Sequence, residues 1–323
     1  MWPRARALVV SMKRKVLFTG GGGCGAEAIY RYLGSKYDLY FGDCNVENIN
    51  PIIPSHRAIG LPQANNPVFA ARVQHICNEL SIDLLVPAVD EELLSLGSSF
   101  DQRKTSLILP SLGFVEKMLD KFKMVEEFSM ANIPVPKSLL FDSDFSPLNF
   151  PCICKPRFGR GSRDITYLYS EKEALKFRDF LAFASDPSLF IIQELAKGVE
   201  YTVQMIADSK ATLHAILPVK VAVKKGITID ARVEKNNIVV DACREIHEKI
   251  PTPGTYNIQL ILTSEGCVLP FEVNPRISTT FCLALAAGLD PLEIFDANRI
   301  SPKAVLEYTD NIRIQRFWQN IIT

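Results

Sequence analysis

Long hydrophobic runs are absent from this sequence. No segment of the 323 residues approaches the roughly 18 uncharged apolar residues from which a membrane-spanning helix is inferred. The apolar stretch at residues 7–10 follows basic residues, but it is too short for the core of a secretory signal, and residues 13–15 are basic again. We therefore expect no membrane partner.

An excess of either charge is also absent. Lysine plus arginine and aspartate plus glutamate number 36 each, so the formal net charge is zero. Nucleic-acid-binding proteins usually carry a large positive surface, so this balance argues against a nucleic-acid partner, although it leaves room for a local basic pocket. A chain of this length with 47% hydrophobic residues is typical of a globular protein with two or three domains.

Paired metal-binding motifs are missing as well. The eight cysteines include no Cys-x-x-Cys pair, and the four histidines show no spacing typical of a zinc site. Unpaired cysteines in apolar segments are typical of reduced, buried thiols in a cytosolic protein. The sequence therefore predicts a cytoplasmic location.

The first part of the chain, residues 13–110, alternates between strand and helix patterns. Compact apolar runs predict buried strands, and the segments between them have helical spacing. This alternation predicts a parallel sheet with helices on both faces. The predicted strands are residues 15–19, 39–43, 84–88 and 107–109, and the predicted helices are 26–33 and 68–80.

The rest of the chain is richer in strands and predicts an α+β arrangement. Helices are predicted at 116–131, where two prolines follow and stop the helix, and at 171–184. The predicted strands are residues 151–156, 165–169, 190–193, 201–205, 212–223, 238–240, 257–262 and 268–273. A glycine-containing loop at 157–163 joins the first two of these strands.

A glycine-rich turn follows the first predicted strand. Gly20–Gly25 satisfies the pattern G-x-G-x-x-G between a strand and a helix, and Asp43 ends the next strand. This pattern is typical of a dinucleotide site, because glycines let the backbone approach a pyrophosphate and the acid can meet the ribose. Two other interpretations stay open: the glycines only allow a tight turn, or the turn binds a different small ligand.

Four polar residues near the end of the chain form the most informative group. Glu272 and Asn274 are two apart on a predicted strand, so their side chains lie on the same face. Gln259 joins them from the preceding strand, and Arg276 follows. Oxygen ligands of this kind suit Mg²⁺, and a guanidinium can hold a phosphoryl oxygen. The residues alone leave two interpretations: a site for a magnesium–nucleotide complex, or a strand edge with ordinary polar residues.

Eight segments follow one another in a characteristic order: Leu119–Phe122, Asn132–Pro136, Phe150–Pro156, Gly159–Arg163, Ile192–Glu194, Gly198–Val203, Asn257–Gln259 and Glu272–Arg276. In this order they resemble the ATP-grasp superfamily, and most closely a short, single-module form of its carbamoyl-phosphate synthase large-subunit-like branch. The resemblance implies an N-terminal Rossmann-like pre-ATP-grasp domain at 13–110. A two-lobed ATP-grasp fold follows, with an N-lobe that carries a phosphate-covering lid at 111–195 and a C-lobe with the metal site at 196–323.

The resemblance also implies which residues bind ATP. Lys155 and Lys121 are similar to the family's basic residues on the phosphates, and Gly159, Gly161 and Ser162 belong to its flexible covering loop. Taken singly, the lysines also fit solvated surface groups, and the loop fits a plain hairpin turn. The remaining implied residues are Gln193, Glu194 and Leu195 in the linker strand that reads adenine, and Glu200 at the ribose hydroxyls.

In the same resemblance Gln259, Glu272 and Asn274 become ligands of Mg²⁺, with Mn²⁺ as an alternative. Arg276 would stabilise charge on the transferring phosphoryl group. The middle strand departs from the family pattern, because residues 217–225 contain lysines where many members have arginines. Lys220 is the best candidate among them for a catalytic contact.

The first domain of this family does not normally bind a dinucleotide, so the resemblance favours another use for the glycine turn. Together with Asp90, Glu91 and Glu92, which end a strand, the turn is expected to help form an acceptor-substrate site. The alternative for these three acids is a solvated cap at the start of a helix.

The function implied by the resemblance is that of an ATP- and Mg²⁺-dependent ligase. A small-molecule carboxylate would attack ATP to form an acyl phosphate, and an amine would then displace phosphate. Family analogy suggests a homodimer. The alternatives are a non-catalytic ATP-binding sensor or subunit, a kinase-like enzyme that stops at the acyl phosphate, and an NAD-dependent oxidoreductase that uses the glycine turn.

Overall fold

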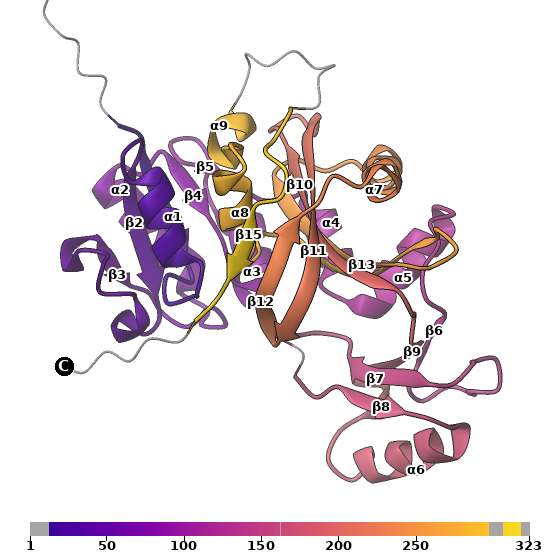
Figure 1. The fold of residues 1–323 in the computed structure, drawn as a ribbon. Helices are drawn as coiled ribbons and strands as arrows, with labels where there is room; N and C mark the ends of the chain where they lie inside the picture. The colour runs from indigo at the N-terminus through magenta and orange to yellow at the C-terminus, as the bar shows by residue number, and fades with distance from the viewer. Residues whose placement is uncertain (1–12, 162, 297–305, 318–323) are drawn as a thin grey trace, which may run out of the picture.

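The computed structural model describes residues 13–161, 163–296 and 306–317, and the strands among these residues form three sheets (Figure 1). The first sheet is parallel, in the order β3-β2-β1-β4-β5. Its strands are β1 (Lys15–Thr19), β2 (Asp38–Asp43), β3 (Ala58–Gly60), β4 (Leu84–Val86) and β5 (Ser106–Leu107), accompanied by the helices α1 (Ala26–Leu33), α2 (Phe69–Leu80) and α3 (Leu93–Ser99) and the 3₁₀ turns η1 (Val46–Asn48), η2 (Ser55–Arg57) and η3 (Asp90–Glu92).

The predicted parallel α/β unit is confirmed by this sheet. The inner strand β1 is buried on both faces, because α1 covers one side and α2 with α3 covers the other. This is why residues 16–18 form an unbroken apolar run rather than an alternating one.

A smaller antiparallel sheet follows, in the order β6-β9-β7-β8. Its strands are β6 (Ser138–Leu140), β7 (Cys152–Pro156), β8 (Thr166–Leu168) and β9 (Phe190–Glu194), with α4 (Leu112–Met118) and α5 (Lys121–Met130) before it and α6 (Glu171–Leu181) and η4 (Pro187–Leu189) within it. The single helix predicted at 116–131 is wrong, because two helices meet here. Asp120 begins the second one, and its carboxylate accepts hydrogen bonds from the Phe122 and Lys123 amides.

The third sheet is antiparallel and has the order β14-β13-β10-β11-β12-β15. Its strands are β10 (Val199–Ala207), β11 (Leu213–Lys225), β12 (Ile227–Val233), β13 (Thr255–Leu262), β14 (Val268–Asn274) and β15 (Arg313–Gln315), and its helices are α7 (Asn237–Lys249), α8 (Phe281–Ala286) and α9 (Pro291–Phe295). These two sheets confirm the predicted α+β second part.

The strand predicted at 238–240 is wrong, because these residues form the first turn of α7. Asn236 caps the helix, and its side chain accepts a hydrogen bond from the Val239 amide. Val239, Cys243 and Ile246 are spaced by four and three, so one face of the helix is buried against the sheet. β-branched residues in the first turn gave the segment its strand-like appearance.

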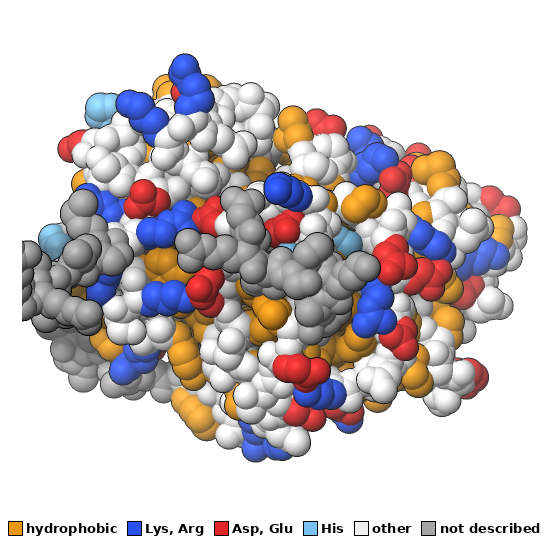
Figure 2. Space-filling view, turned by 90° about the horizontal axis from the view of Figure 1, so that it is seen from above, with side chains coloured by type: hydrophobic (Ala, Val, Ile, Leu, Met, Phe, Trp, Pro, Cys, Tyr) orange, Lys and Arg blue, Asp and Glu red, His pale blue; other side chains and the backbone are white. Residues whose placement is uncertain are grey.

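Helices α8 and α9 lie between the first and third sheets (Figure 1). Phe281 of α8 packs against Phe18 of β1, with ring centroids 6.5 Å apart. The contact brings the glycine turn that follows β1 close to the end of β14. No helix within the described residues is long and apolar enough to cross a membrane. Side chains of both charges are interspersed on the face seen in Figure 2.

Candidate functional site

Strands β13 and β14 bring the predicted metal-binding residues together. Their register pairs Gln259 with Glu272 and Asn257 with Asn274. Directly opposed residues share a face of the sheet, and Gln259 Nε2 donates to Glu272 Oε1 at 3.4 Å. Asn257 is itself held by Thr202 of β10, whose hydroxyl donates to its side-chain oxygen at 2.8 Å. A carboxylate and three amides therefore form one polar group that is partly buried.

A cavity of about 410 Å³ opens over this polar group. We call it the strand cavity, and its lining includes Glu200, Thr202, Lys224, Gln259, Glu272, Asn274 and Arg276. Carboxylate and amide oxygens thus share one space with an ammonium and a guanidinium. A metal-bound phosphate chain needs both kinds of group, because oxygens hold the metal and cations offset the phosphate charge.

Lys224 and Lys225 both line the strand cavity, and Lys224 contacts its polar group. Its Nζ donates to Glu200 Oε1 at 2.7 Å and to Gln259 Oε1 at 2.6 Å. The same ammonium lies 5.6 Å from the centroid of the Phe271 ring. Lys224 therefore ties the predicted ribose-binding acid to one of the predicted metal ligands.

Lys220, the lysine favoured by the sequence, is not brought to this cavity. It is half-exposed, pairs with Glu234 at 3.4 Å and lies opposite Tyr201, which packs in the core beneath α7. Register shifts between Val221 and Lys224 interrupt the regular alternation of side chains. Lys224 consequently reaches the cavity face of the sheet, and we take it as the candidate in place of Lys220.

Lys155 lies at the end of β7 and is almost completely buried. Its Nζ donates to Gln193 Oε1 at 2.9 Å and to the Phe271 carbonyl at 3.2 Å. Burial lowers the pKa of this ammonium to about 7, and nearby Lys121 and Lys224 lower it further, while Glu272 acts in the opposite direction. A neutral or weakly charged lysine at this depth becomes a strong cation when phosphate arrives beside it.

The loop that follows Lys155 is attached to α5. Lys121 Nζ donates to the Gly159 carbonyl at 2.8 Å, so the lysine supports the loop through its backbone. Gly159 and Gly161 have φ angles of 107° and 75°, which other residues adopt only with strain. Gly161 lines the strand cavity. Ser162 lies outside the described residues.

Gln193, Glu194 and Leu195 form the end of β9 and the residue after it. The Gln193 amide group bridges Lys155 and Ser138. The backbone N–H groups of Glu194 and Leu195 already donate to the carbonyls of Lys137 and Pro151, at 2.9 and 3.1 Å. Any backbone contact from these two residues to an adenine therefore falls to their carbonyl groups.

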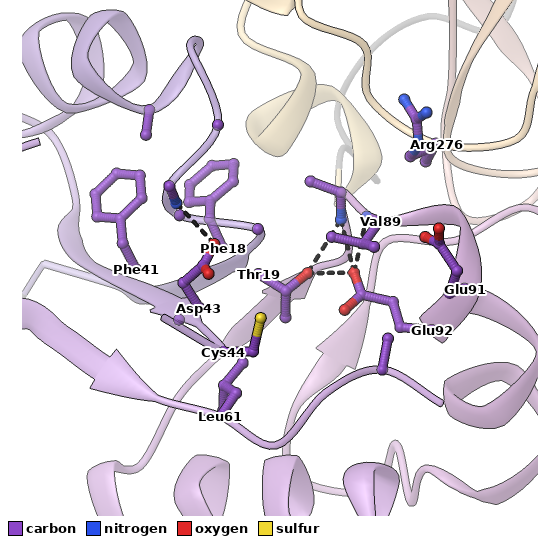
Figure 3. Close-up of a pocket in the computed structure, with 18 of the residues that line it drawn as sticks. Phe18, Thr19, Phe41, Asp43, Cys44, Leu61, Val89, Glu91, Glu92 and Arg276 are labelled. Carbon is purple, nitrogen blue, oxygen red and sulfur yellow. Dashed lines mark hydrogen bonds between the residues drawn. The ribbon is translucent and has the colours of Figure 1, made fainter. Parts of the chain in front are cut away.

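A second cavity of about 740 Å³ lies at the carboxyl end of the first sheet. We call it the turn cavity, because Gly20–Gly25 lines it. Figure 3 shows Phe18, Phe41 and Asp43 on one side and Glu91, Glu92 and Arg276 on the other. The residues that line both cavities are Arg160, Arg163, Arg276, Ser278 and Thr279. The two cavities are therefore neighbours, and they meet at three arginines.

Arg276 stands at this junction and is only 9% exposed. Its Nε donates to Asp90, its Nη1 to the Ile277 carbonyl at 2.9 Å and its Nη2 to Asn274 Oδ1 at 3.3 Å. One guanidinium thus connects a predicted metal ligand on β14 with an acid from the first sheet. A guanidinium held in a fixed position in this way is well placed to stabilise negative charge that develops between two bound ligands.

The alternative of a solvated cap does not hold for Glu92, the last of the three acids Asp90–Glu92. Glu92 is 1% exposed, and its Oε1 accepts hydrogen bonds from the Thr19 hydroxyl and from the Ala88 and Val89 amides. Burial raises the pKa of the Glu92 carboxyl to about 7, against the opposing effect of these donors.

Glu91, the middle acid, instead reaches the loop that covers the strand cavity. Arg160 Nη2 lies 3.3 Å from Glu91 Oε2, so the loop contacts the first sheet across the turn cavity. Both side chains are partly exposed, and the pair is worth little stability at such a site. The pair is of interest for its position, because Glu91 lines the turn cavity and Arg160 lines both cavities.

The glycine turn has a structural reason of its own. Gly20 has a φ of 62°, and a Cβ on Gly22 would lie 2.7 Å from the Asn48 Cβ. Asp43 accepts hydrogen bonds from the Gly22 and Asn45 amides, at 2.8 and 2.9 Å. Both oxygens of the acid that a dinucleotide ribose would require are therefore already engaged, one by the glycine turn and the other by the Asn45 amide after β2.

The donor set of the strand cavity suits a hard cation. Among the described residues no three His, Cys, Asp or Glu side chains are grouped as a metal site. Glu272 supplies one carboxylate, and Gln259 and Asn274 supply amide oxygens. The Lys224 ammonium already rests on Gln259, which shows that the position attracts positive charge. Such a set fits Mg²⁺, which usually completes its shell with phosphate oxygens and water.

Sequence reasoning missed one residue of this site, Lys224, and one contact between two residues that it had named, Asp90 and Arg276. Lys224 lay within the lysine-containing strand that the sequence singled out, but the strand irregularity could not be read from it. The contact of Asp90 with Arg276 joins residues far apart in the chain, and no local signal marks it.

The family model of the ATP-grasp domain matches residues 118–280, slightly more than half of the chain. Similar solved structures cover more of it. The biotin carboxylase domain of Hydrogenobacter thermophilus 2-oxoglutarate carboxylase is 13% identical with a TM-score of 0.70, over 94% of this chain and 74% of that one. N5-carboxyaminoimidazole ribonucleotide synthetase from Thermotoga maritima is 18% identical with a TM-score of 0.59, over 85% and 72%. L-amino acid ligase from Bacillus licheniformis is 12% identical with a TM-score of 0.63, over 88% and 73%. These similarities establish a common fold.

Proposed function

The chain belongs to the ATP-grasp domain family, as the order of its motifs predicted, and from this premise we propose that it is an ATP- and Mg²⁺-dependent ligase. It would join a small-molecule carboxylate to an amine through an acyl phosphate. The narrower assignment to the carbamoyl-phosphate synthase-like branch stays a prediction, as do the homodimer and the domain boundaries.

The observation that carries this proposal is the junction of two cavities at Arg276. The strand cavity has the oxygens and lysines for a magnesium–nucleotide complex, and the turn cavity has room for a second substrate. A carboxylate in the turn cavity and the terminal phosphate in the strand cavity would meet beside Arg276. Holding two reactants in this way replaces an encounter in solution by a reaction within one complex.

Groups that line the strand cavity, and Lys155 behind them, have separate roles in this proposal. Gln259, Glu272 and Asn274 would hold Mg²⁺, which offsets phosphate charge and orients the oxygens when bound. Lys155 and Lys224 would offset the remaining charge, and Glu200 would hold the ribose once Lys224 turns towards phosphate.

Arg276 would stabilise the phosphoryl group as it moves from ATP to the carboxylate oxygen, with ADP as the leaving group. The amine nitrogen then attacks the acyl carbon and phosphate leaves. No protein nucleophile is needed. The loop with Arg160 and Gly161 would exclude water from the acyl phosphate, which otherwise hydrolyses.

The ligands of the similar structures agree with this assignment. The H. thermophilus domain was solved as a dimer with MgADP and bicarbonate, and the PurK enzyme N5-carboxyaminoimidazole ribonucleotide synthetase was solved with ADP. The third similar protein is named as an L-amino acid ligase. They support a nucleotide in the strand cavity, and they leave the substrates of this chain to experiment.

The test is release of ADP from Mg-ATP in the presence of pooled carboxylates and amines. We expect ADP and phosphate in equal amounts, and hydroxylamine should trap the acyl phosphate as a hydroxamate when amines are left out. Tight Mg-ATP binding without turnover in any pool would instead identify a nucleotide sensor. Thermal stabilisation by NAD(H) and not by Mg-ADP would refute the proposal.

Glu272→Ala and Glu265→Ala form a matched pair for the same assay. Glu265 is exposed in the turn that joins β13 and β14, so it belongs to the same strand pair but not to the cavity. Loss of turnover in the first variant and normal turnover in the second would place the reaction in the strand cavity. Equal rates would remove Glu272 from the site.

A further inference from the structure

Arg316, the residue that follows β15, contacts three segments that are distant in the chain. Its Nε donates to the Thr228 carbonyl at 2.9 Å, its Nη1 to the Cys24 carbonyl at 3.0 Å and its Nη2 to the Thr279 carbonyl. Every nitrogen of the guanidinium therefore donates to a backbone oxygen. A lysine could not replace it, because all three hydrogen-bond donors of an ammonium lie on one nitrogen, whereas those of a guanidinium lie on three nitrogens in one plane.

The three accepting residues line the two cavities. Cys24 belongs to the glycine turn and lines the turn cavity, Thr228 of β12 lines the strand cavity, and Thr279 lines both. Arg316 itself is not part of either lining. Its guanidinium joins the three segments that carry Cys24, Thr228 and Thr279, and these segments form parts of the cavity walls.

Apart from bonds to the adjoining helix α1, the other hydrogen bonds between the glycine turn and the rest of the protein tie it to β2. The Gly21 amide donates to the Gly42 carbonyl and the Gly22 amide to Asp43, so these bonds do not hold the turn against the loop at Thr279. Backbone hydrogen bonds to a charged group are among the stronger ones in proteins. The bond to the Cys24 carbonyl is therefore well suited to hold the turn in place.

We infer that Arg316 is a positioning residue that holds the glycine turn against the strand cavity. The consequence for turnover rests on the proposed function, since it requires one substrate in each cavity. The local consequence does not: without Arg316, the turn around Cys24 should open more often, whatever the protein binds.

Hydrogen–deuterium exchange tests the local consequence. The amides of Gly22 and Gly23 in the turn donate to Asp43 and to the Gly20 carbonyl, so their exchange, followed by peptide mass spectrometry, reports opening of the turn. In Arg316→Ala the peptide that covers the turn should exchange about tenfold faster, the effect expected when one charge-assisted hydrogen bond is lost. Exchange in α7 should stay within about twofold of the wild type, because this helix lies away from the broken bonds.

Arg313→Ala is the matched control. Arg313 lies on the same strand but pairs with Asp230 at the surface, so its loss tests whether loosening β15 is sufficient. Arg316→Lys should give an intermediate exchange rate in the turn. An unchanged exchange rate of the turn in Arg316→Ala overturns the inference. So does an equal rise in α7, or an equal rise in Arg313→Ala, because either would indicate general loosening.

Kinetics test the consequence for turnover in the wild type and in Arg316→Ala. We expect kcat to fall about tenfold while the KM for Mg-ATP stays within about threefold, because Arg316 contacts only backbone carbonyls of the cavity walls and none of the side chains proposed to bind the nucleotide. A raised KM with unchanged kcat would overturn the positioning role. If the wild type has no ligase activity the proposed function fails, and the hydrogen-exchange result still decides whether Arg316 holds the turn.

Discussion

Lys224 donates a hydrogen bond to the side-chain oxygen of Gln259 at 2.6 Å. An internal ammonium thus rests on an oxygen that the sequence assigned to a metal ion. The same ammonium lies 2.7 Å from Glu200. A magnesium–nucleotide complex would require this lysine to change partners, from protein oxygens to phosphate.

Lys224→Met should therefore slow Mg-ATP turnover by about a hundredfold, the usual effect of removing one group that stabilises developing charge. Lys220→Met should stay within about twofold of the wild type, because Lys220 faces the other side of the sheet. ADP release measures both. The opposite ranking would restore the assignment made from the sequence.

Nucleotide binding should take up a proton through Lys155. Burial lowers the pKa of this ammonium to about 7, so at pH 8 most of it is neutral in the free protein. Phosphate beside it favours the charged form, and binding of Mg-ADP should then absorb close to one proton. Calorimetry in two buffers of different ionisation enthalpy measures this number. Lys155→Arg, which stays charged throughout, should absorb none, and equal uptake by both proteins would exclude Lys155.

The stability of the protein should fall as the pH rises from about 4.5 to about 7, through Glu92. Burial raises the folded-state pKa of this carboxyl to about 7 from its ordinary 4.5. Between these two pKa values the folded protein keeps a proton that the unfolded chain loses. The contribution of Glu92 to the free energy of unfolding is therefore fully present below the pKa of the unfolded state, and it is lost as the pH rises to the pKa of the folded state. The total is about 3 kcal/mol.

Glu92→Gln provides the check on this pH dependence. The amide keeps an oxygen for the three donors but has no proton to lose in this range. Urea denaturation at pH 5 and pH 7.5 should give a smaller difference for the variant than for the wild type, with Glu91→Gln as the exposed control. The same difference in all three proteins would assign the effect to other groups.

Asp90→Asn should destabilise the protein by about 3 kcal/mol, because it leaves the buried Arg276 without its carboxylate. Asp230→Asn removes a comparable acid from the surface pair with Arg313 and should have a much smaller effect. Denaturant midpoints compare the two. A similar decrease in the free energy of unfolding in both variants would mean that the Asp90–Arg276 pair stabilises the protein no more than a surface pair does.

The features that the sequence predicted correctly are those fixed by local periodicity. Two-residue alternation placed Glu272 and Asn274 on one face, and a continuous apolar run marked β1 as buried on both sides. These patterns need no knowledge of the rest of the fold. The order of the motifs then identified the family.

The features that the sequence missed depend on contacts between distant segments or on irregular backbone. Alternation would place Lys220 and Lys224 on the same face, but the shifts within β11 and β12 separate them. The burial of Glu92 depends on Thr19, which comes from another strand. Residues 238–240 have strand-like composition, and only the Asn236 cap and the sheet beneath α7 make them helical.

The core shared by β1, α1 and α8 has a practical consequence for dissecting this molecule. Ala26 and Ile29 of α1 and Phe18 of β1 lie in one hydrophobic cluster with Phe281 and Leu285. Excision of the first 110 residues as a separate fragment would leave this apolar face bare, and the fragment would tend to aggregate. A chimera that replaces the first sheet must therefore also replace α8 by a helix with a matching apolar face, although the two segments lie far apart in the sequence.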